Sequence, residues 1–292
     1  MYRNFTPRQS GRWRNVVSVD EISDSDYLVI INAILGGSPV NYIPERILYF
    51  KREPEAFAFP SQTWTPMPPG SHIFKAENGY FPNHWMVNKT YDELKLCGFP
   101  TKVKRVSWVT SNTGDGGYSD DKTEVLRGHR SRMTFLRRFF AAYPGVLDLY
   151  GRGFFMPEYM RRDVKGEIYD KWDGLAEYRY TFAFENEWEP GYFSEKILDA
   201  VLAGCMPIYW GCPDLERYFP EGSFIRLDIE ASDAPERAMN IVMSDYREKN
   251  LAALQEAKRR ALTEYNFWEM LCLAVNRLDT GTEKPEDIPY PF

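Results

Sequence analysis

The chain has 292 residues, of which 43% are hydrophobic and 27% are charged, so it can hold two domains of ordinary size and is too apolar to be disordered. The formal net charge of −6 argues against a broad nucleic-acid-binding surface, since such a surface needs an excess of Lys and Arg on one face. No secretion signal or membrane-spanning apolar run is visible, so we expect a soluble protein of the cytoplasm, unless a membrane anchor has been trimmed away.

The first part of the chain contains short apolar runs that are typical of buried strands. These runs cover residues 15–19, 27–35 and 46–50, and turn-rich connections separate them. Residues 60–70 are rich in Pro and predict a loop. Buried strands joined in this way favour an α/β arrangement.

A second α/β unit is predicted to begin at Lys102, after the Gly98-Phe99-Pro100 break. Its predicted strands are 103–112, 145–151 and 175–184, and its predicted helices are 131–142 and 234–263, before a C-terminal helix at 267–278. Strands that alternate with helices predict parallel sheets covered on both faces. We therefore expect one domain at 1–101 and a second at 102–268. The helix and tail at 269–292 would pack back on the first domain.

Polar and charged residues interrupt a buried pattern between residues 178 and 211. An apolar strand ends at Glu185 and Asn186, and a helix is predicted to begin after Ser194, its N-cap, and to end at Gly204. In open parallel sheets, ligands bind beyond the carboxyl ends of the strands, where helix N-termini offer free N–H groups. We therefore expect a ligand site at this edge.

Lys196 lies in the first turn of that helix, where a cation is unfavourable by roughly 0.3–1 kcal/mol. An anionic ligand such as a diphosphate would compensate for this cost. The alternative is that Lys196 pairs with Glu195 or Glu187 at a solvated corner. Glu195 could instead accept hydrogen bonds from ribose hydroxyl groups.

Residues 184–211, FENEWEPGYFSEKILDAVLAGCMPIYWG, followed by SFI at 223–225, resemble the donor-binding signature of glycosyltransferase family 10, the α1,3/4-fucosyltransferases. In that family an FEN element, a Tyr-x-Thr-Glu-Lys element and a (V/I)P(I/V)YWG strand recur in this order, and Ser194 here replaces the Thr. The similarity extends upstream to SWVTSN and to the Arg-x-x-Phe start of a helix, so it covers most of residues 102–227. It implies a GT-B fold, in which two Rossmann-like domains face each other across a cleft.

The resemblance also implies a set of residues that contact the donor in the C-terminal domain. By position they are Glu185, Asn186, Tyr192, Ser194, Glu195 and Lys196, with Arg132 as the phosphate-binding arginine and Arg130 as the competing candidate. The three histidines show no spacing typical of metal ligands, so we interpret His72, His84 and His129 as structural or surface residues.

The first domain is more weakly matched, and its main candidate is a catalytic base. Glu53 is followed by Pro54 and has Phe57 four positions later, which resembles the Glu of the catalytic loop of the family. Because the family pattern is Glu-Ser-Pro, Glu55 stays an alternative. The other interpretation is a surface carboxylate in the charged loop KREPE.

The function implied is that of an inverting glycosyltransferase that moves L-fucose from GDP-fucose to a hydroxyl group of an oligosaccharide or glycoconjugate. The resemblance implies no required metal or other cofactor, and Asp24-Ser25-Asp26 is better explained as a turn than as a metal-binding Asp-x-Asp pair. Two alternatives stay open. The scaffold could use another nucleotide sugar, such as a xylosyl donor, or the chain could bind nucleotide sugars or glycans without catalysis.

Overall fold

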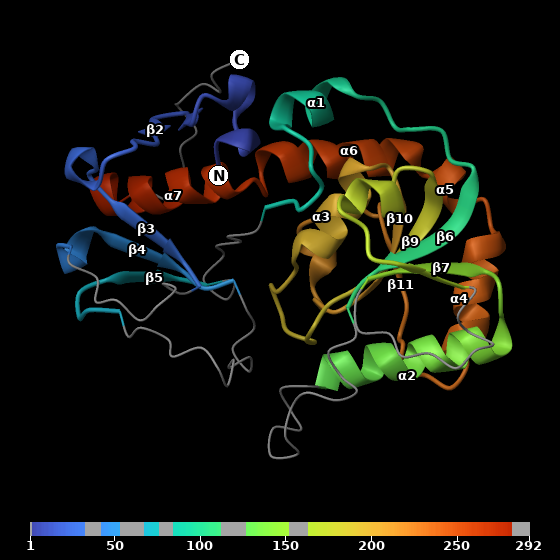
Figure 1. Ribbon diagram of the computed structural model, residues 1–292. Coiled ribbons are helices and arrows are strands. Elements are labelled where there is room, and N and C mark those ends of the chain that lie inside the picture. Colours follow the sequence, from blue (N-terminus) through green and yellow to red (C-terminus); the bar gives the residue numbers. More distant parts are fainter. Residues whose placement is uncertain are drawn as a thin grey trace. The chain divides into compact units, whose positions relative to one another are not determined.

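The computed structural model (Figure 1) describes residues 2–32, 42–52, 67–75, 84–111, 127–151 and 163–281. The chain divides into two compact units, the first made of Met1–His84, Lys89–Leu96 and Leu262–Phe292, and the second of Trp85–Asn88 and Cys97–Ala261. Each unit contains a parallel sheet, so the predicted α/β class is confirmed, and two such sheets agree with the GT-B interpretation. None of the helices in the described ranges has the length and apolar character needed to cross a membrane.

The first unit contains a small parallel sheet and an antiparallel hairpin. Its elements are β1 (Arg12–Trp13), β2 (Val16–Val17), β3 (Leu28–Ile31), β4 (Ile47–Phe50), β5 (His72–Phe74), α1 (Tyr91–Leu96) and α7 (Phe267–Thr280). Strands β3, β4 and β5 are parallel, with β4 in the centre. Every residue of β4 is buried, as expected for an apolar run in the middle of a parallel sheet.

Two local predictions for this unit differ from the structure. The strand expected at 15–19 is not part of the parallel sheet, because its residues 16–17 pair antiparallel with β1. Helix α1 was not predicted, although its capping box can be read from the sequence. The backbone N–H of Thr90 donates to Glu93 at 2.7 Å, and the backbone N–H of Glu93 donates back to the Thr90 hydroxyl at 3.3 Å.

The hairpin and α7 are joined by a buried ion pair. One carboxylate oxygen of Glu269 accepts from the indole N–H of Trp13 and from Nε of Arg14, both at 2.7 Å. Nη2 of Arg14 donates to the other oxygen at 2.8 Å, and the side chains of Arg14 and Glu269 are only 7% and 8% exposed. The two ends of the described chain are therefore held together by charge-assisted hydrogen bonds in a dry environment.

The second unit is built on a six-stranded sheet in the order β11-β10-β9-β6-β7-β8. Its elements are β6 (Lys104–Val109), α2 (Arg127–Ala142), β7 (Leu147–Tyr150), β8 (Val164–Gly166), β9 (Tyr178–Phe184), α3 (Glu195–Leu202), β10 (Met206–Trp210), β11 (Ile225–Arg226), α4 (Ala234–Met243), α5 (Tyr246–Lys249) and α6 (Leu251–Thr263). All pairings in this sheet are parallel. Helix α3 packs against β9 and β10, and α2 packs against α4 (Figure 1).

The helix predicted at 234–263 is divided into α4, α5 and α6. The first break occurs at Ser244, which has extended backbone angles and whose hydroxyl group donates to the carbonyl of Ile241 at 2.7 Å. The second occurs at Asn250, whose side chain donates to the carbonyl of Tyr246 at 2.8 Å. Ser and Asn side chains compete with helical hydrogen bonds in this way, so the single long helix was a wrong prediction.

Replacing Glu269 by Gln is expected to lower the free energy of unfolding by about 3–5 kcal/mol, because the buried guanidinium of Arg14 loses its counter-charge. The double variant Arg14→Met/Glu269→Gln should recover part of the loss, since it also removes the buried charge of Arg14 and leaves an acceptor for Trp13. Chemical denaturation of both variants checks this. Equal stability of the single and double variants would contradict it.

Candidate functional site

The N-terminus of α3 lies beside the carboxyl end of β9. Ser194 is the N-cap of α3, and its hydroxyl oxygen accepts from the backbone N–H of Lys196. Gly204, just beyond the other end, has φ +67, so both predicted limits of this helix are confirmed. Because β10 pairs in register with β9 up to the pair Trp210 and Phe184, the two strands end at the same edge of the sheet.

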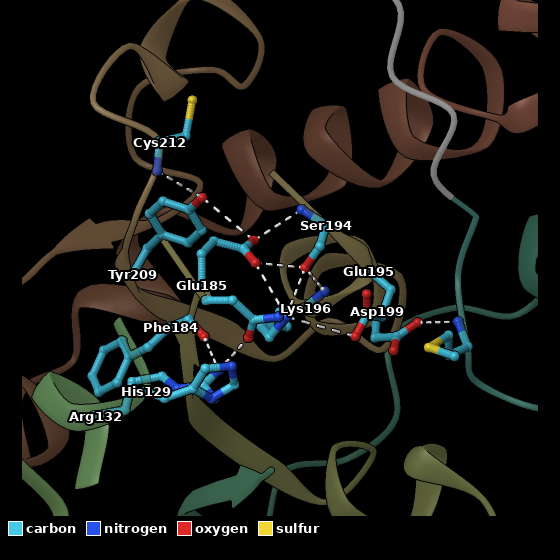
Figure 2. Close-up of polar contacts among 12 residues, drawn as sticks. His129, Arg132, Phe184, Glu185, Ser194, Glu195, Lys196, Asp199, Tyr209 and Cys212 are labelled. Carbon is cyan, nitrogen blue, oxygen red and sulfur yellow. Dashed lines mark hydrogen bonds and ion pairs between the residues drawn. The ribbon is translucent and has the colours of Figure 1, made fainter. Parts of the chain in front are cut away.

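Glu185, the first residue after β9, is completely buried under the start of α3 (Figure 2). Its carboxylate accepts from the backbone N–H of Ser194 at 2.9 Å and from the Ser194 hydroxyl at 2.6 Å. It also accepts from Nζ of Lys196 at 3.2 Å and from the hydroxyl of Tyr209 on β10 at 3.4 Å. One carboxylate thus connects two strands of the sheet with the helix N-terminus.

Lys196 is 19% exposed and is held by this buried carboxylate. Its Nζ also donates to the Ser194 hydroxyl at 3.0 Å, and Glu195 lies farther away, at 3.8 Å. Of the two partners considered from the sequence, Glu195 lies near Lys196 but farther away than Glu185, and among the ion pairs of the described residues there is none between Lys196 and Glu187. The nearest charged partner, Glu185, was not considered as an ion-pair partner, because its contact depends on how α3 packs over the end of β9.

Arg132 reaches the same corner from α2, and it is 2% exposed. Its Nη1 donates to the carbonyl of Phe184 at 3.2 Å and to Oδ1 of Asn186 at 2.8 Å. Within the described ranges, no carboxylate pairs with this guanidinium and its buried Nε has no hydrogen-bond partner. Burial, opposed by the charge of Glu185, lowers the pKa of Arg132 to about 10, so the group stays a cation at neutral pH. Arg130, the competing candidate, is exposed.

His129 belongs to this cluster and was not assigned to the site from the sequence. Its Nδ1 lies 2.7 Å from Nη2 of Arg132, and its side chain is buried (Figure 2). One feature of the sequence could have indicated His129, namely its position three residues before Arg132, since residues i and i+3 lie on the same face of a helix.

A second polar network lies one turn along α3. Nζ of Lys171 lies 3.2 Å from Glu195 and 3.3 Å from Asp199. Asp199 is buried and accepts from the backbone N–H groups of Met86 and Val87 at 2.7 and 3.3 Å. Burial would lower the pKa of Lys171, but the charges of Glu195 and Asp199 outweigh it and raise that pKa. Neither Lys171 nor Asp199 was predicted.

The remaining candidates divide between the described and the undescribed parts of the chain. Tyr192 is buried, 4% exposed, in the loop before α3. Glu53 and Glu55 lie outside the described residues, so their role as catalytic base stays a prediction. Within the described ranges, no group of three or more His, Cys, Asp or Glu side chains could hold a metal ion.

Residues 99–241 match the family model "Glycosyltransferase family 10 (fucosyltransferase) C-term". The chain is similar to the alpha-(1,3)-fucosyltransferase FucT of Helicobacter pylori, 34% identical over 68 residues, which are 23% of this chain and 14% of that protein. It is also similar to the alpha-(1,3)-fucosyltransferase 4 of Mus musculus, 31% identical over 123 residues, which are 39% of this chain and 27% of that protein. The matches thus span roughly a seventh to a quarter of these relatives.

Among solved structures, the chain is similar to a crystal structure of an alpha1,3-fucosyltransferase with GDP-fucose. The sequence identity is 17%, the TM-score is 0.41, and the match covers 91% of this chain and 73% of the other. A crystal structure of the same kind of enzyme with GDP matches at 18% identity and the same TM-score, over 89% of this chain and 72% of the other.

Gly128, in the first turn of α2, is expected to tolerate no side chain. A Cβ there would lie 2.0 Å from the carbonyl oxygen of Asn186, so Gly128→Ala must push α2 away from the loop that Arg132 contacts. We expect a loss of about 1–3 kcal/mol in the free energy of unfolding. Gly98→Ala is the matched control, because nothing lies within 4 Å of its Cβ. Equal stability of the two variants would contradict the close approach.

Asp199 predicts a measurable pH dependence of stability. Burial raises its pKa to about 6, opposed by Lys171, above the 3.8 expected in the unfolded chain. The folded protein therefore binds the carboxyl proton of Asp199 more tightly than the unfolded chain does. The stability gained from this proton is lost as the pH rises from about 4 to about 6. Replacing Asp199 by Asn removes this contribution. Between pH 4 and pH 7, the free energy of unfolding of the variant should rise by on the order of 2 kcal/mol relative to that of the wild type, as measured by denaturation. A difference between the two proteins that does not change with pH would contradict the assignment.

Proposed function

Because residues 99–241 form a domain of glycosyltransferase family 10 (fucosyltransferase), we propose that this chain is an inverting fucosyltransferase that transfers L-fucose from GDP-fucose to a glycan hydroxyl group. The observation that carries the proposal is the convergence of two cations at one edge of the sheet. Lys196 lies in the first turn of α3, and Arg132 is buried nearby, both in contact with the segment 184–186. This pair suits a diphosphate, which carries negative charge on both phosphoryl groups.

Lys196 supports the proposal through the geometry of its ammonium group. An ammonium group has three donors, of which one is directed to Glu185 and one to the Ser194 hydroxyl. The third is left for a phosphate oxygen of the donor. The ion pair with Glu185 fixes the long side chain in advance, so less conformational entropy is lost when the diphosphate binds.

Glu185 acts in this proposal as a positioning residue. It is completely buried, and its oxygens accept from Ser194, Lys196 and Tyr209. Its carboxylate therefore sets the position of the cation and of the helix start, and the donor itself touches Lys196. Asn186 has the same kind of role for Arg132, because its Oδ1 accepts from Nη1.

Glu195 is proposed to bind the ribose of the nucleotide. Lys171 contacts its Oε1, which orients the carboxylate for hydrogen bonds from ribose hydroxyl groups, as acidic side chains accept in dinucleotide sites. Tyr192 and the capping residue Ser194 complete the loop and the helix start at this side of the proposed donor site.

The proposed reaction needs a base on one side of the sugar and charge stabilisation on the other. Glu53, or Glu55 in its place, would remove the proton of the acceptor hydroxyl group while the diphosphate leaves from the opposite face. The transition state resembles an oxocarbenium ion, and the leaving group gains negative charge. Lys196 and Arg132 would stabilise that charge where it develops, so the proposal includes no metal cofactor.

Product formation from GDP-fucose is expected with a glycan acceptor, and not from GDP-mannose or UDP-galactose at the same concentration. Lys196→Ala should lower the rate about 100-fold or more and weaken donor binding, because it removes an electrostatic contact to the diphosphate. Glu53→Gln should keep donor binding and lose transfer. Calorimetry with GDP-fucose and a product assay separate the two effects.

Lys249→Ala is the matched control, since Lys249 is a solvent-exposed lysine that pairs with Asp245 four residues earlier. Its binding and turnover should equal those of the wild type. Transfer from another nucleotide sugar would reassign the donor. Binding of GDP-fucose without turnover, unchanged in Glu53→Gln, would instead identify a binding protein without catalysis.

A further inference from the structure

We propose that His129 is a positioning residue that fixes the guanidinium group of Arg132, so that one defined edge of this group faces the diphosphate of the donor. The proposal rests on the function proposed above, and it adds a residue that the family signature in the sequence did not include. It is carried by the contacts of Arg132, by the burial of both side chains, and by the donor chemistry of arginine.

The contact between the two side chains determines the tautomer of the imidazole. Nη2 of Arg132 lies 2.7 Å from Nδ1 of His129, and a guanidinium group can only donate hydrogen bonds. Nδ1 must therefore accept, and the ring proton of neutral His129 must be on Nε2. A doubly protonated ring would place an N–H group against an N–H group at this distance.

The same contact decides which donors of Arg132 are left for a ligand. Both hydrogens of Nη1 are directed to protein acceptors, the carbonyl of Phe184 and Oδ1 of Asn186. His129 accepts one hydrogen of Nη2, while Nε has no hydrogen-bond partner among the described residues. Nε–H and the hydrogen of Nη2 on the same side form one edge of the planar group. When His129 accepts the other hydrogen of Nη2, this edge can bind two oxygens of a phosphate in parallel.

The electrostatic surroundings keep His129 an acceptor. Burial is the main cause that lowers its pKa, to about 3, and the charges of Arg132 and Lys196 add to the effect. Glu185, a carboxylate that contributes to the same cluster, is engaged by Ser194, Lys196 and Tyr209. The imidazole therefore stays neutral across the pH range in which a transferase works.

The chain allows a matched pair of substitutions at this position. In His129→Asn, Oδ1 occupies the place of Nδ1 and can accept from Arg132. In His129→Phe, the ring stays and the acceptor is lost. The measured quantity is the ratio of the affinities for GDP and for guanosine by calorimetry, because this ratio isolates the contribution of the diphosphate.

We expect His129→Phe to lower the GDP to guanosine ratio by about tenfold or more, since a hydrogen bond that orients a charged group is lost, and to leave guanosine affinity unchanged. His129→Asn should keep the ratio within about threefold of wild type. A ratio in His129→Phe equal to that of wild type would overturn the inference alone. A wild-type chain with no preference for GDP over guanosine would overturn the proposed function, and the inference with it.

A second measurement reads the tautomer of His129 in the wild-type chain itself, and a variant serves only to assign the signal. The chain has only three histidines, so nitrogen NMR of histidine-labelled protein gives few signals, and the His129→Asn spectrum identifies that of His129. The expected result at pH 5.5 is a neutral ring with the proton on Nε2. A protonated ring, or a neutral ring with the proton on Nδ1, would overturn the inference.

Discussion

The structure of the candidate site depends on one buried carboxylate. Glu185 follows the central strand β9, is completely covered, and accepts hydrogen bonds from both the backbone and the side chain of the residue that caps α3. A buried carboxylate is costly unless donors surround it, and here the donors come from β10, from the loop and from α3 itself. The need to satisfy this charge therefore fixes where the helix begins relative to the sheet.

The two cations of the site are held in opposite ways. Lys196 has a carboxylate partner and is partly exposed, whereas Arg132 is buried among neutral acceptors. A cation with a partner is stable before a ligand binds. A buried guanidinium whose Nε has no partner among the described residues gains most when an anion binds. In the proposed donor site, the first side chain would stay in place while ligands exchange, and the second would distinguish a phosphate from water.

Much of the second unit could be predicted, because its signals are local. The apolar runs of β9 and β10, the hydroxyl group of Ser194 and the left-handed Gly204 each act within a few residues, and the family signature added Lys196 and Arg132 to the same site. The pairing of Lys196 with Glu185, eleven residues away, could not be predicted, since it depends on how α3 packs over the strand. The same holds for Lys171, whose partners lie 24 and 28 residues along the chain, and for His129, whose role depends on the burial of its neighbour.

The breaks at Ser244 and Asn250 were visible in the sequence but were outweighed by strong helix formers around them. Their side chains bond to backbone carbonyls, and Arg247, between the two breaks, contacts a residue of the sheet. The backbone N–H of Arg247 donates to the hydroxyl of Tyr180 at 3.2 Å, and its Nε donates to the carbonyl of Gly204 at 2.9 Å. Helix propensity alone cannot predict such contacts, because they are tertiary contacts that stabilise a break in the helix.

The ion pair between Arg14 and Glu269 joins residues that are 255 positions apart, and this separation affects how the protein is made. A ribosome releases the chain from its N-terminus, so the hairpin of the first unit emerges long before α7 exists to cover Trp13. The second unit, by contrast, is almost one continuous stretch, from Cys97 to Ala261, and can complete its sheet during translation. The first unit needs α7 to cover Trp13, so we expect it to be the later of the two units to reach its native packing.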